Sequence, residues 1–403
     1  MEISAKFGIL FYMTFVEALK TLPVENLVEK SLNSSAKEVE ESLRKPTLSL
    51  VDFARLISPV ANGNLEKMAN LARSLTLRRF GKVVRLFAPL YVSNECVNNC
   101  KYCGFSRDNN VLRVTLTIDE VLQEARELKR QGFRSILLVA GEHPKFVSTA
   151  YLEECVKAVH SEVPSVSLEI GRLTVDEYRR LVKAGAEGLV LYQETYNPKL
   201  YAQLHLSGPK RHFENRLETQ DRAYLGGFRR LGIGALYGLG DWRYEAICVA
   251  AHANHLLKNC WKSYITISIP RLRPCAGLFN PPVTLTDTEL VQLVCAYRIM
   301  LPDVGLVLST REPSYLRDGL LPLGITLISA GSHTEPGGYT GAGKEKLHKT
   351  RGAMIFDESV TPNAAAEHQF QIADTRSVKE VVETIQRLGY EPVWKDWDAT
   401  FSA

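Results

Sequence analysis

The strongest constraint on the fold is an alternation of short β-branched runs with amphipathic segments, which begins at residue 83. Between most of the runs, apolar residues recur at helical spacing. Alternating strands and helices predict a parallel α/β sheet, and eight repeats predict a closed (β/α)8 barrel of the TIM type. An open doubly wound sheet is the alternative. The eight predicted strands are 83–90, 135–139, 165–170, 188–192, 233–237, 264–269, 305–308 and 325–329.

Three of the helices within this pattern begin with a capping box. In such a box a Thr and a Glu three residues later each satisfy a backbone amide of the first turn. Gly132 and Gly185 stand where two helices should end, because glycine adopts the left-handed C-cap conformation without strain. The predicted boxes are Thr117 with Glu120, Thr174 with Glu177, and Thr286 with Glu289.

The barrel is predicted to carry an extension at each end, which divides the chain into residues 1–80, 81–331 and 332–403. The first segment has apolar residues at helical spacing and predicts a helical extension, with the stretch 7–16 in a buried helix. Residues 332–375 are rich in Gly, Pro and polar residues, which indicates a lid-like loop or a loosely ordered segment. An amphipathic helix over about 378–388 follows, and we expect the aromatic tail 392–398 to pack on the barrel.

Charge and hydropathy restrict the function class. The chain has 49 Lys and Arg against 45 Asp and Glu, and such a small excess does not predict a nucleic-acid-binding protein. No apolar run reaches the ~18 residues of a membrane span, and the features of a signal peptide are not found. We therefore expect a cytoplasmic protein that has neither a nucleic-acid nor a membrane partner.

Three of the eight cysteines, Cys96, Cys100 and Cys103, follow the first predicted strand directly. In a reducing compartment such crowding indicates a metal site or catalysis. A four-iron cluster takes four ligands, so three cysteines leave one iron open to a substrate or cofactor. A zinc knuckle, or a cluster closed by a remote fourth cysteine, is the alternative. Zinc sites usually show a second C-x2-C pair, which this sequence lacks.

Polar residues recur just after the predicted strands. Active sites of (β/α)8 barrels lie at the C-terminal ends of the strands, and charges buried there are costly unless they are paired or bound to a ligand. Their repetition on one rim therefore predicts a polar ligand. These residues are Tyr91, Gly141, Glu142, His143, Glu169, Arg172, Gln193, Glu194, Gly238, Gly240, Asp241, Arg271, Arg273, Ser309, Arg311, Ser329 and Ser332.

The motif C-x3-C-x2-C, with Tyr102 before its last cysteine, resembles the signature of the radical S-adenosylmethionine (radical SAM) superfamily. Longer phrases, spread over residues 50–398, resemble the tyrosine lyases of thiamine biosynthesis, the 2-iminoacetate synthases. The cysteine motif alone specifies the superfamily, whereas the phrases together specify the tyrosine lyases. The phrases are 89–94, 102–106, 141–143, 192–196, 270–275, 309–312, 336–339 and 394–398.

The resemblance implies a carbon–carbon lyase that holds a 4Fe–4S cluster and S-adenosylmethionine. The reduced cluster would cleave this cofactor to methionine and a 5′-deoxyadenosyl radical, which would initiate cleavage of the Cα–Cβ bond of L-tyrosine. The products would be 5′-deoxyadenosine, 4-cresol and the 2-iminoacetate that feeds thiazole formation. The implied partners are L-tyrosine, an electron donor such as flavodoxin or ferredoxin, and the thiazole synthase.

Under this resemblance the three cysteines bind the cluster and other rim residues bind the cofactor. Gly141 and Glu142 would receive the cofactor's amino group, because a carboxylate and an ammonium form a charge-assisted hydrogen bond; an ordinary strand-end turn is the alternative. Glu169 would hold the ribose or form a salt bridge with Arg172. Tyr102 would lie on the adenine or pack the cluster loop. The other expected cofactor-binding residues are Gly238, Gly240, Arg271 and Arg273.

The substrate needs a clamp for its carboxylate, which the forked guanidinium of arginine matches. The resemblance to related amino-acid lyases of the same superfamily branch implies Arg311 as the clamp, helped by the hydroxyls of Ser309 and Ser329, with Tyr91 near the amino end of the substrate. A rim salt bridge to a neighbouring acid is the alternative role for Arg311. The competing clamps are Arg271 and Arg273, and we expect one of the three arginines to serve the cofactor.

Three other functions remain open. The tyrosine lyase of hydrogenase maturation needs a second cluster on a C-terminal cysteine set, and no cysteine follows Cys295 in the sequence. A tryptophan lyase would need a pocket shaped for indole. A non-catalytic iron–sulfur redox protein would not need the polar rim. His252 and His255 are interpreted as solvated or core histidines, and the cysteines outside the motif as buried apolar side chains.

Overall fold

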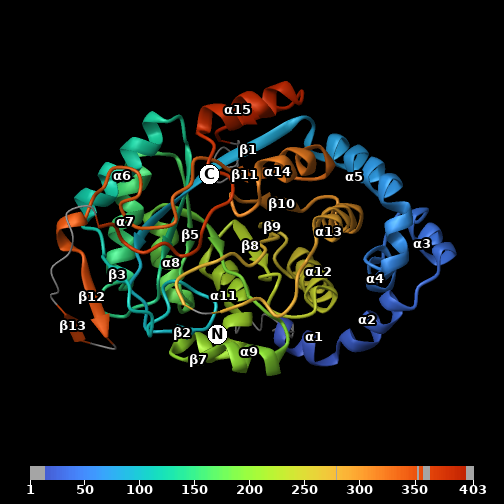
Figure 1. Cartoon of the computed structure of the whole chain (residues 1–403), viewed down its shortest axis with the longest axis horizontal. Helices are drawn as coiled ribbons and strands as arrows, with labels where there is room; N and C mark the ends of the chain where they lie inside the picture. Colours follow the sequence, from blue (N-terminus) through green and yellow to red (C-terminus); the bar gives the residue numbers. More distant parts are fainter. Residues whose placement is uncertain (1–13, 278, 352–353, 357–363, 396–403) are drawn as a thin grey trace, which may run out of the picture.

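The computed structural model describes residues 14–277, 279–351, 354–356 and 364–395 of the chain. The barrel strands are β1 (Val83–Ser93), β4 (Ser135–Ala140), β5 (Ser165–Glu169), β6 (Ala186–Val190), β8 (Arg230–Gly234), β9 (Tyr264–Ser268), β10 (Gly305–Leu308) and β11 (Leu327–Ser329). All eight run parallel, and β1 closes the ring by pairing with β4 on one side and β11 on the other (Figure 1). The predicted (β/α)8 barrel is confirmed.

Each predicted strand coincides with one of these strands, but the ends differ. The sequence predicts the fifth strand at 233–237, whereas β8 spans Arg230–Gly234. Beyond Gly234 the chain is still apolar and buried through Ala235, Leu236 and Tyr237. It has left the ladder there and keeps only isolated bridges to its neighbours. The prediction from apolar residues therefore placed this strand a few residues too late in the sequence, because the chain remains buried after its hydrogen-bonded pairing has ended.

Helices cover the outside of the barrel, and all three predicted capping boxes are formed. In the first box, Glu120 N donates to Thr117 Oγ1 and Thr117 N donates to the Glu120 carboxylate. Gly132 and Gly185 have the predicted left-handed conformation, with φ of 107° and 117°. The helices are α6 (Ile118–Arg130), α7 (Thr149–Glu162), α8 (Val175–Ala184), α11 (Thr219–Gly226), α12 (Trp242–Asn259), α13 (Asp287–Met300) and α14 (Ser314–Leu320).

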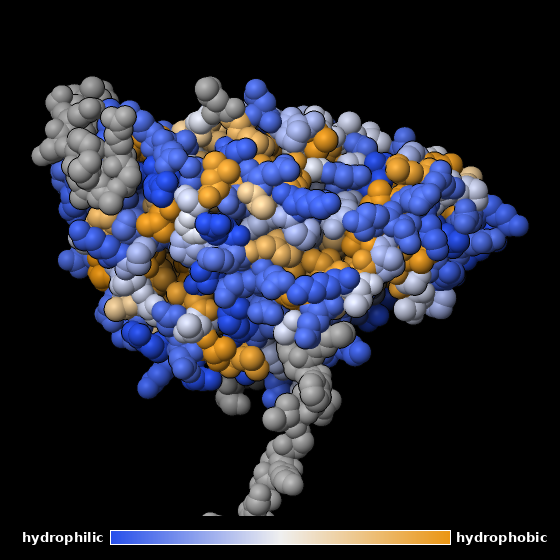
Figure 2. Space-filling model, turned by 90° about the horizontal axis from the view of Figure 1, so that it is seen from below, coloured by the Kyte–Doolittle hydropathy of each residue, from blue (hydrophilic) through white to orange (hydrophobic). Residues whose placement is uncertain are grey.

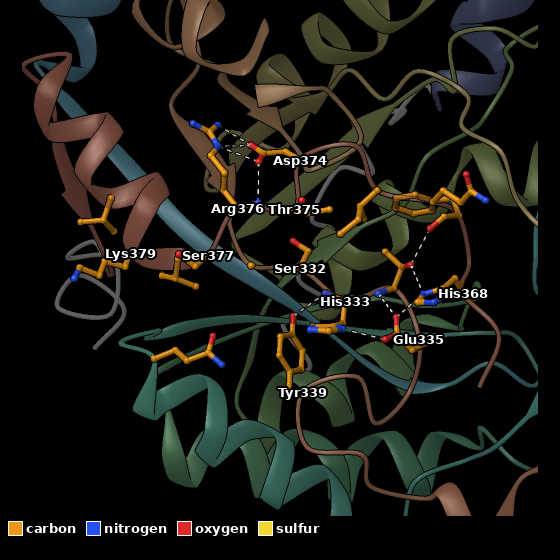
Figure 3. Close-up of a pocket in the computed structure, with 18 of the residues that line it drawn as sticks. Ser332, His333, Glu335, Tyr339, His368, Asp374, Thr375, Arg376, Ser377 and Lys379 are labelled. Atoms are coloured by element: carbon orange, nitrogen blue, oxygen red, sulfur yellow. Dashed lines mark hydrogen bonds and ion pairs between the residues drawn. The ribbon is translucent and has the colours of Figure 1, made fainter. Parts of the chain in front are cut away.

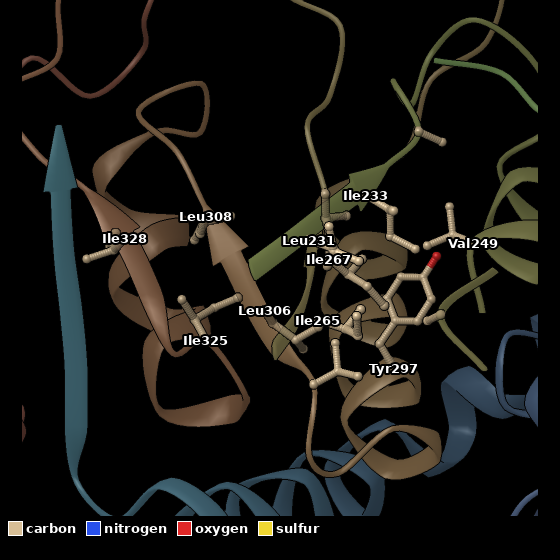
Figure 4. Close-up of a cluster of buried hydrophobic side chains, with 14 of the residues drawn as sticks. Leu231, Ile233, Val249, Ile265, Ile267, Tyr297, Leu306, Leu308, Ile325 and Ile328 are labelled. Atoms are coloured by element: carbon tan, nitrogen blue, oxygen red, sulfur yellow. The ribbon is translucent and has the colours of Figure 1, made fainter. Parts of the chain in front are cut away.

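The layer between strands and helices is apolar because alternate residues of a strand point to the same face. In β8, Leu231 and Ile233 lie near Val249 of α12 and Tyr297 of α13 (Figure 4). All four side chains are buried. The same spacing of two recurs in β9 and β10, with Ile265, Ile267, Leu306 and Leu308.

A layer of short helices precedes the barrel. They are α1 (Phe15–Thr21), α2 (Val24–Leu32), α3 (Ala36–Leu43), α4 (Leu50–Leu56), the 3-10 helix η1 (Pro59–Asn64) and α5 (Leu65–Phe80). Helix α5 packs along α13, and α2 and α4 pack against α12 (Figure 1). Of the stretch 7–16, which was predicted as helical, Phe15 and Val16 are buried in α1, and 7–13 lie outside the described residues. Within the described ranges, no helix combines the length and the apolar character of a membrane span.

Residues 364–377, which we call the strap, cross the mouth of the barrel at the C-terminal ends of the strands. Backbone hydrogen bonds tie the strap to four separate loops: Gly104 N donates to Gln369 O, Gln369 N to Thr334 O, Gln371 N to Pro274 O and Ala373 N to Thr310 O. The segment predicted as a lid-like loop thus includes this ordered crossing.

The rest of the C-terminal segment packs on the barrel. Helix α15 (Val378–Arg387) leads to β14 (Glu391–Val393), which pairs parallel with the start of β1. Trp394 packs edge-on against Phe133, with 5.4 Å between the ring centroids. Of the aromatic tail, residues 396–398 lie outside the described part. The remaining short elements are β2 (Asn99–Cys100), β3 (Leu112–Arg113), α9 (Pro198–Leu204), β7 (His205–Ser207), η2 (Pro209–Arg211), α10 (Phe213–Leu217), η3 (Leu321–Leu323), η4 (Lys344–Lys346), β12 (His348–Arg351) and β13 (Met354–Phe356).

Candidate active site

Two cavities lie side by side at the mouth of the barrel, and we call them the cluster cavity and the inner cavity. Four residues, Val139, Glu169, Tyr192 and Gln369, line both cavities, so the two adjoin. The cluster cavity is also lined by Cys96, Asn98, Cys100, Cys103, Gly141, Glu142, Glu194, Lys210 and Arg216. The inner cavity is also lined by Tyr91, Ser309, Arg311, Ser329, Ser332, Thr334 and Phe370.

The loop that carries the cysteines is held in shape by a buried arginine. Arg113 is fully buried, and its guanidinium donates to the carbonyl oxygens of Asn94 (2.7 Å), Phe105 (3.1 Å) and Ser106 (2.7 Å). Inside the loop, Cys100 N donates to Ser106 Oγ (3.1 Å). Because these carbonyls belong to both ends of the loop, Arg113 fixes the positions of the cysteines between them.

The three motif cysteines present free thiols to the cluster cavity. Burial, reinforced by the neighbouring Cys96, raises the pKa of Cys103 to about 12, and burial also raises the pKa of Cys100. The sulfurs of Cys100 and Cys103 therefore need a bound cation to become thiolates, which an iron cluster supplies. Among the described residues, no three His, Cys, Asp or Glu side chains converge as ligands of one ion. Three thiols in one cavity fit a cluster, in which each cysteine binds its own iron.

Gly141 and Glu142 follow β4 and lie beside the thiols. A Cβ atom on Gly141 would stand 2.2 Å from the carbonyl oxygen of Glu95, so only glycine fits against the cluster loop here. Val97 N donates to the carbonyl of Glu142, and Asn98 Nδ2 donates to Glu142 Oε2, both at 2.8 Å. The Glu142 carboxylate is thereby fixed at the edge of the cavity, where it can accept from an ammonium group.

Glu194, Lys210 and Arg216 form a buried charged group in the cluster cavity. The Glu194 carboxylate lies 2.6 Å from Lys210 Nζ and 3.4 Å from Arg216 Nη2. Burial opposes ionisation of Glu194, but the two cations prevail and lower its pKa. Glu194 has a φ of 71°, the one positive value at a non-glycine residue in the described ranges, and such strain persists where the surroundings enforce it. Two cations on one carboxylate leave this wall positive.

Glu169 stands at the boundary between the two cavities. Its pKa is raised to about 7, first by burial and then by the charge of Glu194, while Arg311 acts in the opposite direction. The salt bridge to Arg172 that was considered for Glu169 is not formed, since Arg172 donates to Asn215 Oδ1 and to the carbonyl of Pro209. Its carboxylate is therefore free to face a ligand in either cavity.

Arg311 faces the inner cavity, and its guanidinium carbon lies 3.3 Å from the ring centroid of Phe370. In the part of the chain that the structure describes, no carboxylate lies within ion-pair distance of this guanidinium. Its neighbour Glu312 pairs instead with Arg271. An arginine without a carboxylate partner in a cavity can bind one from a ligand.

The strap closes the inner cavity through Gln369 and Phe370. The Tyr91 hydroxyl donates to Gln369 Oε1 at 2.7 Å, and Phe370 carries the Arg311 stack. Two serine hydroxyls complete the wall: Ser309 Oγ accepts from Arg311 N (3.4 Å) and Ser329 Oγ accepts from Thr310 N (3.2 Å). Tyr91, Ser309, Arg311 and Ser329 thus share one cavity, as the sequence analysis expected of substrate-binding residues.

Two predicted cofactor-binding residues lie outside both cavities. Arg271 is engaged by two acids: its Nε lies 3.0 Å from Glu312 Oε1, and its Nη1 lies 2.7 Å from Asp287 Oδ1. The Arg271 side chain is thus held in salt bridges with two acids. The expectation that Arg271 faces a ligand is wrong in this structure. Arg273 also does not line either cavity.

Three further predicted positions pack the cluster loop from behind. The Tyr102 hydroxyl bonds His205 Nε2 at 2.7 Å, and Lys210 Nζ lies 5.5 Å from the Tyr102 ring centroid. This corresponds to the packing alternative for Tyr102. A Cβ atom on Gly238 would meet Leu272, and one on Gly240 would meet Leu200. These two glycines permit close packing and do not line either cavity.

An outer cavity of about 1030 Å³ adjoins the inner cavity, because Ser332, Thr334 and Phe370 line both. At one side of it, His333 and His368 flank Glu335, with Nδ1–carboxylate distances of 3.0 and 2.6 Å (Figure 3). The labelled groups that come from the end of the strap and from α15 are Asp374, Thr375, Arg376, Ser377 and Lys379. Ser332 Oγ is buried without a hydrogen-bond partner among the described residues.

Sequence reasoning missed Lys210, Arg216, Gln369 and Phe370. Lys210 and Arg216 lie in the connection between β6 and β8, and Gln369 and Phe370 lie in the strap. None of them follows a barrel strand directly, so the strand-end rule could not find them. His252 and His255 are core residues, as expected: Tyr196 bonds His252 (2.8 Å) and Asp221 bonds His255 (3.2 Å). The cysteines buried outside the motif are Cys155, Cys248, Cys260 and Cys295, while Cys275 is half-buried.

Two family models match the chain. The Radical SAM superfamily matches residues 90–248, and the Biotin and Thiamin Synthesis associated domain matches residues 268–391. The first region holds the cysteine motif, Glu142, Glu169 and the Glu194 group. The second holds Arg311, Ser309, Ser329 and the strap.

Several curated proteins are similar over nearly the whole chain. The 2-iminoacetate synthases of Escherichia coli (strain K12) and Salmonella typhimurium are each 37% identical over 387 residues, which is 96% of this chain and 97% of theirs. The X-ray structure of the FeFe-hydrogenase maturase HydG from Carboxydothermus hydrogenoformans superposes with a TM-score of 0.82 at 34% identity. That alignment covers 94% of this chain and 84% of the maturase.

Proposed function

The chain belongs to the 2-iminoacetate synthase family of the radical SAM superfamily, and from this premise we propose how its cavities serve a tyrosine lyase. The enzyme cleaves the Cα–Cβ bond of L-tyrosine to 2-iminoacetate and 4-cresol. It uses a 4Fe–4S cluster and S-adenosylmethionine, as its family does. One observation supports this function at the site. Three thiols line the cluster cavity, and an arginine without a carboxylate partner among the described residues lines the adjoining inner cavity.

Cys96, Cys100 and Cys103, which line one cavity, would hold the cluster, and S-adenosylmethionine would bind beside it. When bound, the cluster and the cofactor supply reductive cleavage of the sulfonium and the radical that initiates the reaction. The Glu142 carboxylate, oriented by Asn98, accepts hydrogen bonds from the amino group of the cofactor. A bound cofactor would place its ribose toward Glu169, whose carboxylate has no bond to a neighbouring arginine.

The positive wall formed by Glu194, Lys210 and Arg216 attracts the carboxylate of the cofactor. Both cations can supply this attraction, and the pKa of Lys210 is raised to about 12 despite its burial. It therefore stays charged at any pH at which the enzyme is studied.

L-Tyrosine occupies the inner cavity. Arg311 binds the carboxylate of the substrate through two parallel hydrogen bonds, and Ser309 and Ser329 line the same wall. Tyr91, held by Gln369, faces the amino end of the substrate. Phe370 excludes water from the Arg311 guanidinium on the strap side, which strengthens the ion pair with the substrate.

Product analysis tests this function. Reconstituted anaerobic protein with dithionite, S-adenosylmethionine and L-tyrosine should release 4-cresol, 5′-deoxyadenosine and glyoxylate, the hydrolysis product of 2-iminoacetate. L-Tryptophan is the matched control, because a tryptophan lyase would instead consume tryptophan. Formation of 5′-deoxyadenosine without 4-cresol from tyrosine would refute tyrosine as the substrate. Absence of both products would refute the radical chemistry.

The similarity to HydG raises a second candidate, the tyrosine lyase of hydrogenase maturation. The sequence has no cysteine after Cys295 for the second cluster that this reaction was expected to need. Because the 2-iminoacetate synthases match this chain over 97% of their own length, we expect the protein to release 2-iminoacetate without further conversion. Cyanide among the products of the tyrosine reaction would favour the maturation activity.

We further propose that the thiazole synthase receives the product and that a protein of the flavodoxin or ferredoxin type supplies electrons. 2-Iminoacetate hydrolyses in water, so direct transfer to a consuming enzyme preserves it. The outer cavity supports this role, because it adjoins the inner cavity at Ser332, Thr334 and Phe370. Phe370→Ala should increase the ratio of free glyoxylate to thiazole product in a coupled assay if the product leaves along this route.

Cluster chemistry of this kind needs a reducing compartment, so we propose the cytoplasm as the place of action. We also propose that residues 81–331 form the catalytic barrel, with 1–80 as a helical extension and 332–403 as a C-terminal extension. Limited proteolysis of the native protein would test these boundaries, because a flexible junction is cut first.

A further inference from the structure

Two segments of the chain, one of which is the cluster loop, have few acidic residues and several basic ones. Residues 195–213 contain no Asp or Glu but include Lys199, Lys210 and Arg211, and residues 96–107 contain Lys101 and Arg107 without an acid. Lys199, Lys101 and Arg211 are exposed. These two segments are distant in sequence. They can form one positively charged surface only if they lie side by side in the fold.

The two segments are hydrogen-bonded to each other. Strand β2 pairs antiparallel with β7, with Asn99 opposite Ser207 and Cys100 opposite His205. Lys101 N also donates to the carbonyl of Leu204 at 3.1 Å. Gly208 approaches so closely that a Cβ atom there would stand 2.4 Å from Asn98 Oδ1. The exposed side of β7 is thus directly attached to the strand that carries a cluster cysteine.

One large apolar side chain stands at the centre of this area. Leu206 lies between the two residues of β7 that pair with β2, and 48% of its surface is exposed. Helix α9 leads into β7 and exposes Lys199, Ala202 and Gln203. Helical spacing of three and four places these three residues on one face of α9. An apolar centre with a polar, cationic surround has the general composition of a protein interface.

The acids Asp108, Glu194 and Glu214, which flank the two segments, are each paired with a cation, two of them with Arg107 and Lys210 of the segments themselves. Asp108 pairs with Arg107 at 3.1 Å, and Glu214 pairs with Lys20 at 2.7 Å. Glu194 is buried against Lys210. The exposed cations Lys101, Lys199 and Arg211 have no acid within ion-pair distance among the described residues, so the exposed side of the two segments carries positive charge. Figure 2 looks onto the side where α9, β2 and β7 lie in Figure 1, and it shows apolar groups set among hydrophilic ones.

We propose that the surface formed by Lys101, Lys199, Ala202, Gln203 and Leu206 is the docking face for a small acidic protein that delivers single electrons to the cluster. The proposal rests on the proposed function only in that the cluster must be reduced before each turnover. In the docked complex the carrier loses one electron and the cluster gains it; no bond or proton is exchanged.

The character of this face suits such a carrier. Electron-transfer complexes are transient and bury small areas, so one apolar side chain within a cationic surround is sufficient. Complementary charge raises the rate of encounter and aligns the partners. Contact at Leu206 would bring the carrier against the backbone pairing between β7 and β2, the strand that contains the cluster ligand Cys100.

The test uses the cluster-loaded enzyme and an acidic flavodoxin, with the double variant Lys101→Glu/Lys199→Glu. The first readout is the rate at which reduced flavodoxin reduces the cluster. This rate is measured from the decrease in the absorbance of the cluster. We expect the variant to be slowed about tenfold or more at low ionic strength, since rim charges act mainly on association, and the difference to shrink in high salt. Reduction by dithionite should be unchanged, because a small reductant needs no docking face.

The matched control is Lys258→Glu/Lys262→Glu, which makes the same charge change on exposed lysines at the C-terminal end of α12. That end leads into β9, so it lies at the opposite mouth of the barrel from the cysteines. Leu206→Asn tests the apolar centre without a change of charge, and it should weaken the docking of flavodoxin while iron content stays at the wild-type level.

Equal slowing by both lysine pairs, or none by the first pair, would refute the docking face. Slowing with dithionite as well would assign the effect to the cluster and would also refute it. If the wild-type protein makes no 4-cresol with dithionite, the tyrosine lyase activity fails, whereas the rate of cluster reduction by flavodoxin still decides the docking face.

Discussion

Arg311→Lys tests the central assignment, because it keeps the positive charge in the inner cavity and removes only the forked geometry. An arginine can make two parallel hydrogen bonds to a carboxylate, whereas a lysine acts as a point charge. One lost charge-assisted hydrogen bond is worth about 1.5–3 kcal/mol. The guanidinium also stacks on Phe370 at 3.3 Å, a contact worth about 0.5–2 kcal/mol. Because lysine retains part of the hydrogen bonding and part of the contact with Phe370, we expect the substitution to cost about 2–3 kcal/mol of transition-state stabilisation.

This loss corresponds to a decrease of about 30- to 150-fold in kcat/KM for L-tyrosine. The assay follows 4-cresol by chromatography while the concentrations of tyrosine and of S-adenosylmethionine are varied separately. The apparent affinity for S-adenosylmethionine should change less than threefold, since Arg311 lines only the inner cavity. Arg271→Lys is the control: its side chain binds Glu312 and Asp287 outside the cavities, so it should leave the KM for tyrosine unchanged.

A fall in kcat/KM below threefold would refute the clamp. An equal loss for the substrate and the cofactor would move Arg311 to a shared or structural role. A large effect of Arg271→Lys on tyrosine alone would show that the side chains rearrange when the ligands bind, and that the competing clamp is the true one.

Three further changes test other parts of the site. Cys100→Ser should prevent loading of a four-iron cluster, as measured by iron per chain and by the spectrum of the reduced protein; a full cluster in this variant would refute its role as a ligand. Asp374→Ala removes the partner of the fully buried Arg317 and should lower the free energy of unfolding by about 3–5 kcal/mol in denaturant; a loss under 1 kcal/mol would contradict a buried ion pair. Burial raises the pKa of Glu169 to about 7, so the folded protein holds this proton longer than the unfolded chain, and stability falls as pH rises from 4.5 to 7. In the ligand-free protein, Glu169→Gln should remove this decrease in the free energy of unfolding with pH. If the free energies of unfolding of variant and wild type differ by the same amount at every pH, the raised pKa of Glu169 is refuted.

The barrel was predictable because its signals are local. Each strand is a short apolar run, and helices between them carry their own caps, such as Thr117 with Glu120. Once the barrel is accepted, geometry gathers strand-end residues at one mouth. That step was sufficient to bring Arg311, Ser309 and Ser329 together without any knowledge of side-chain contacts.

Side-chain direction was not predictable in the same way. Arg271 and Arg311 both follow barrel strands, yet the first turns to Glu312 and Asp287 while the second faces the cavity. Which arginine finds an acid depends on helix α13 and on the residue after Arg311, and these meet only in three dimensions. Gln369 shows the limit more clearly, since it bonds Tyr91 across 278 positions of sequence, and no local pattern marks it.

The two matched regions explain why the sequence specified the cofactor more firmly than the substrate. The region matched by the radical SAM superfamily, 90–248, contains all residues that we assign to the cluster and to S-adenosylmethionine. The second region, 268–391, contains Arg311, Ser309, Ser329 and the strap residue Gln369. A short motif can mark a cofactor that a whole superfamily shares, but a substrate pocket assembled from strand ends and a crossing strap has no such motif. Changes of substrate should therefore arise by substitution in the second region and at Tyr91, and among the described residues Glu169 is the one carboxylate that lines both cavities.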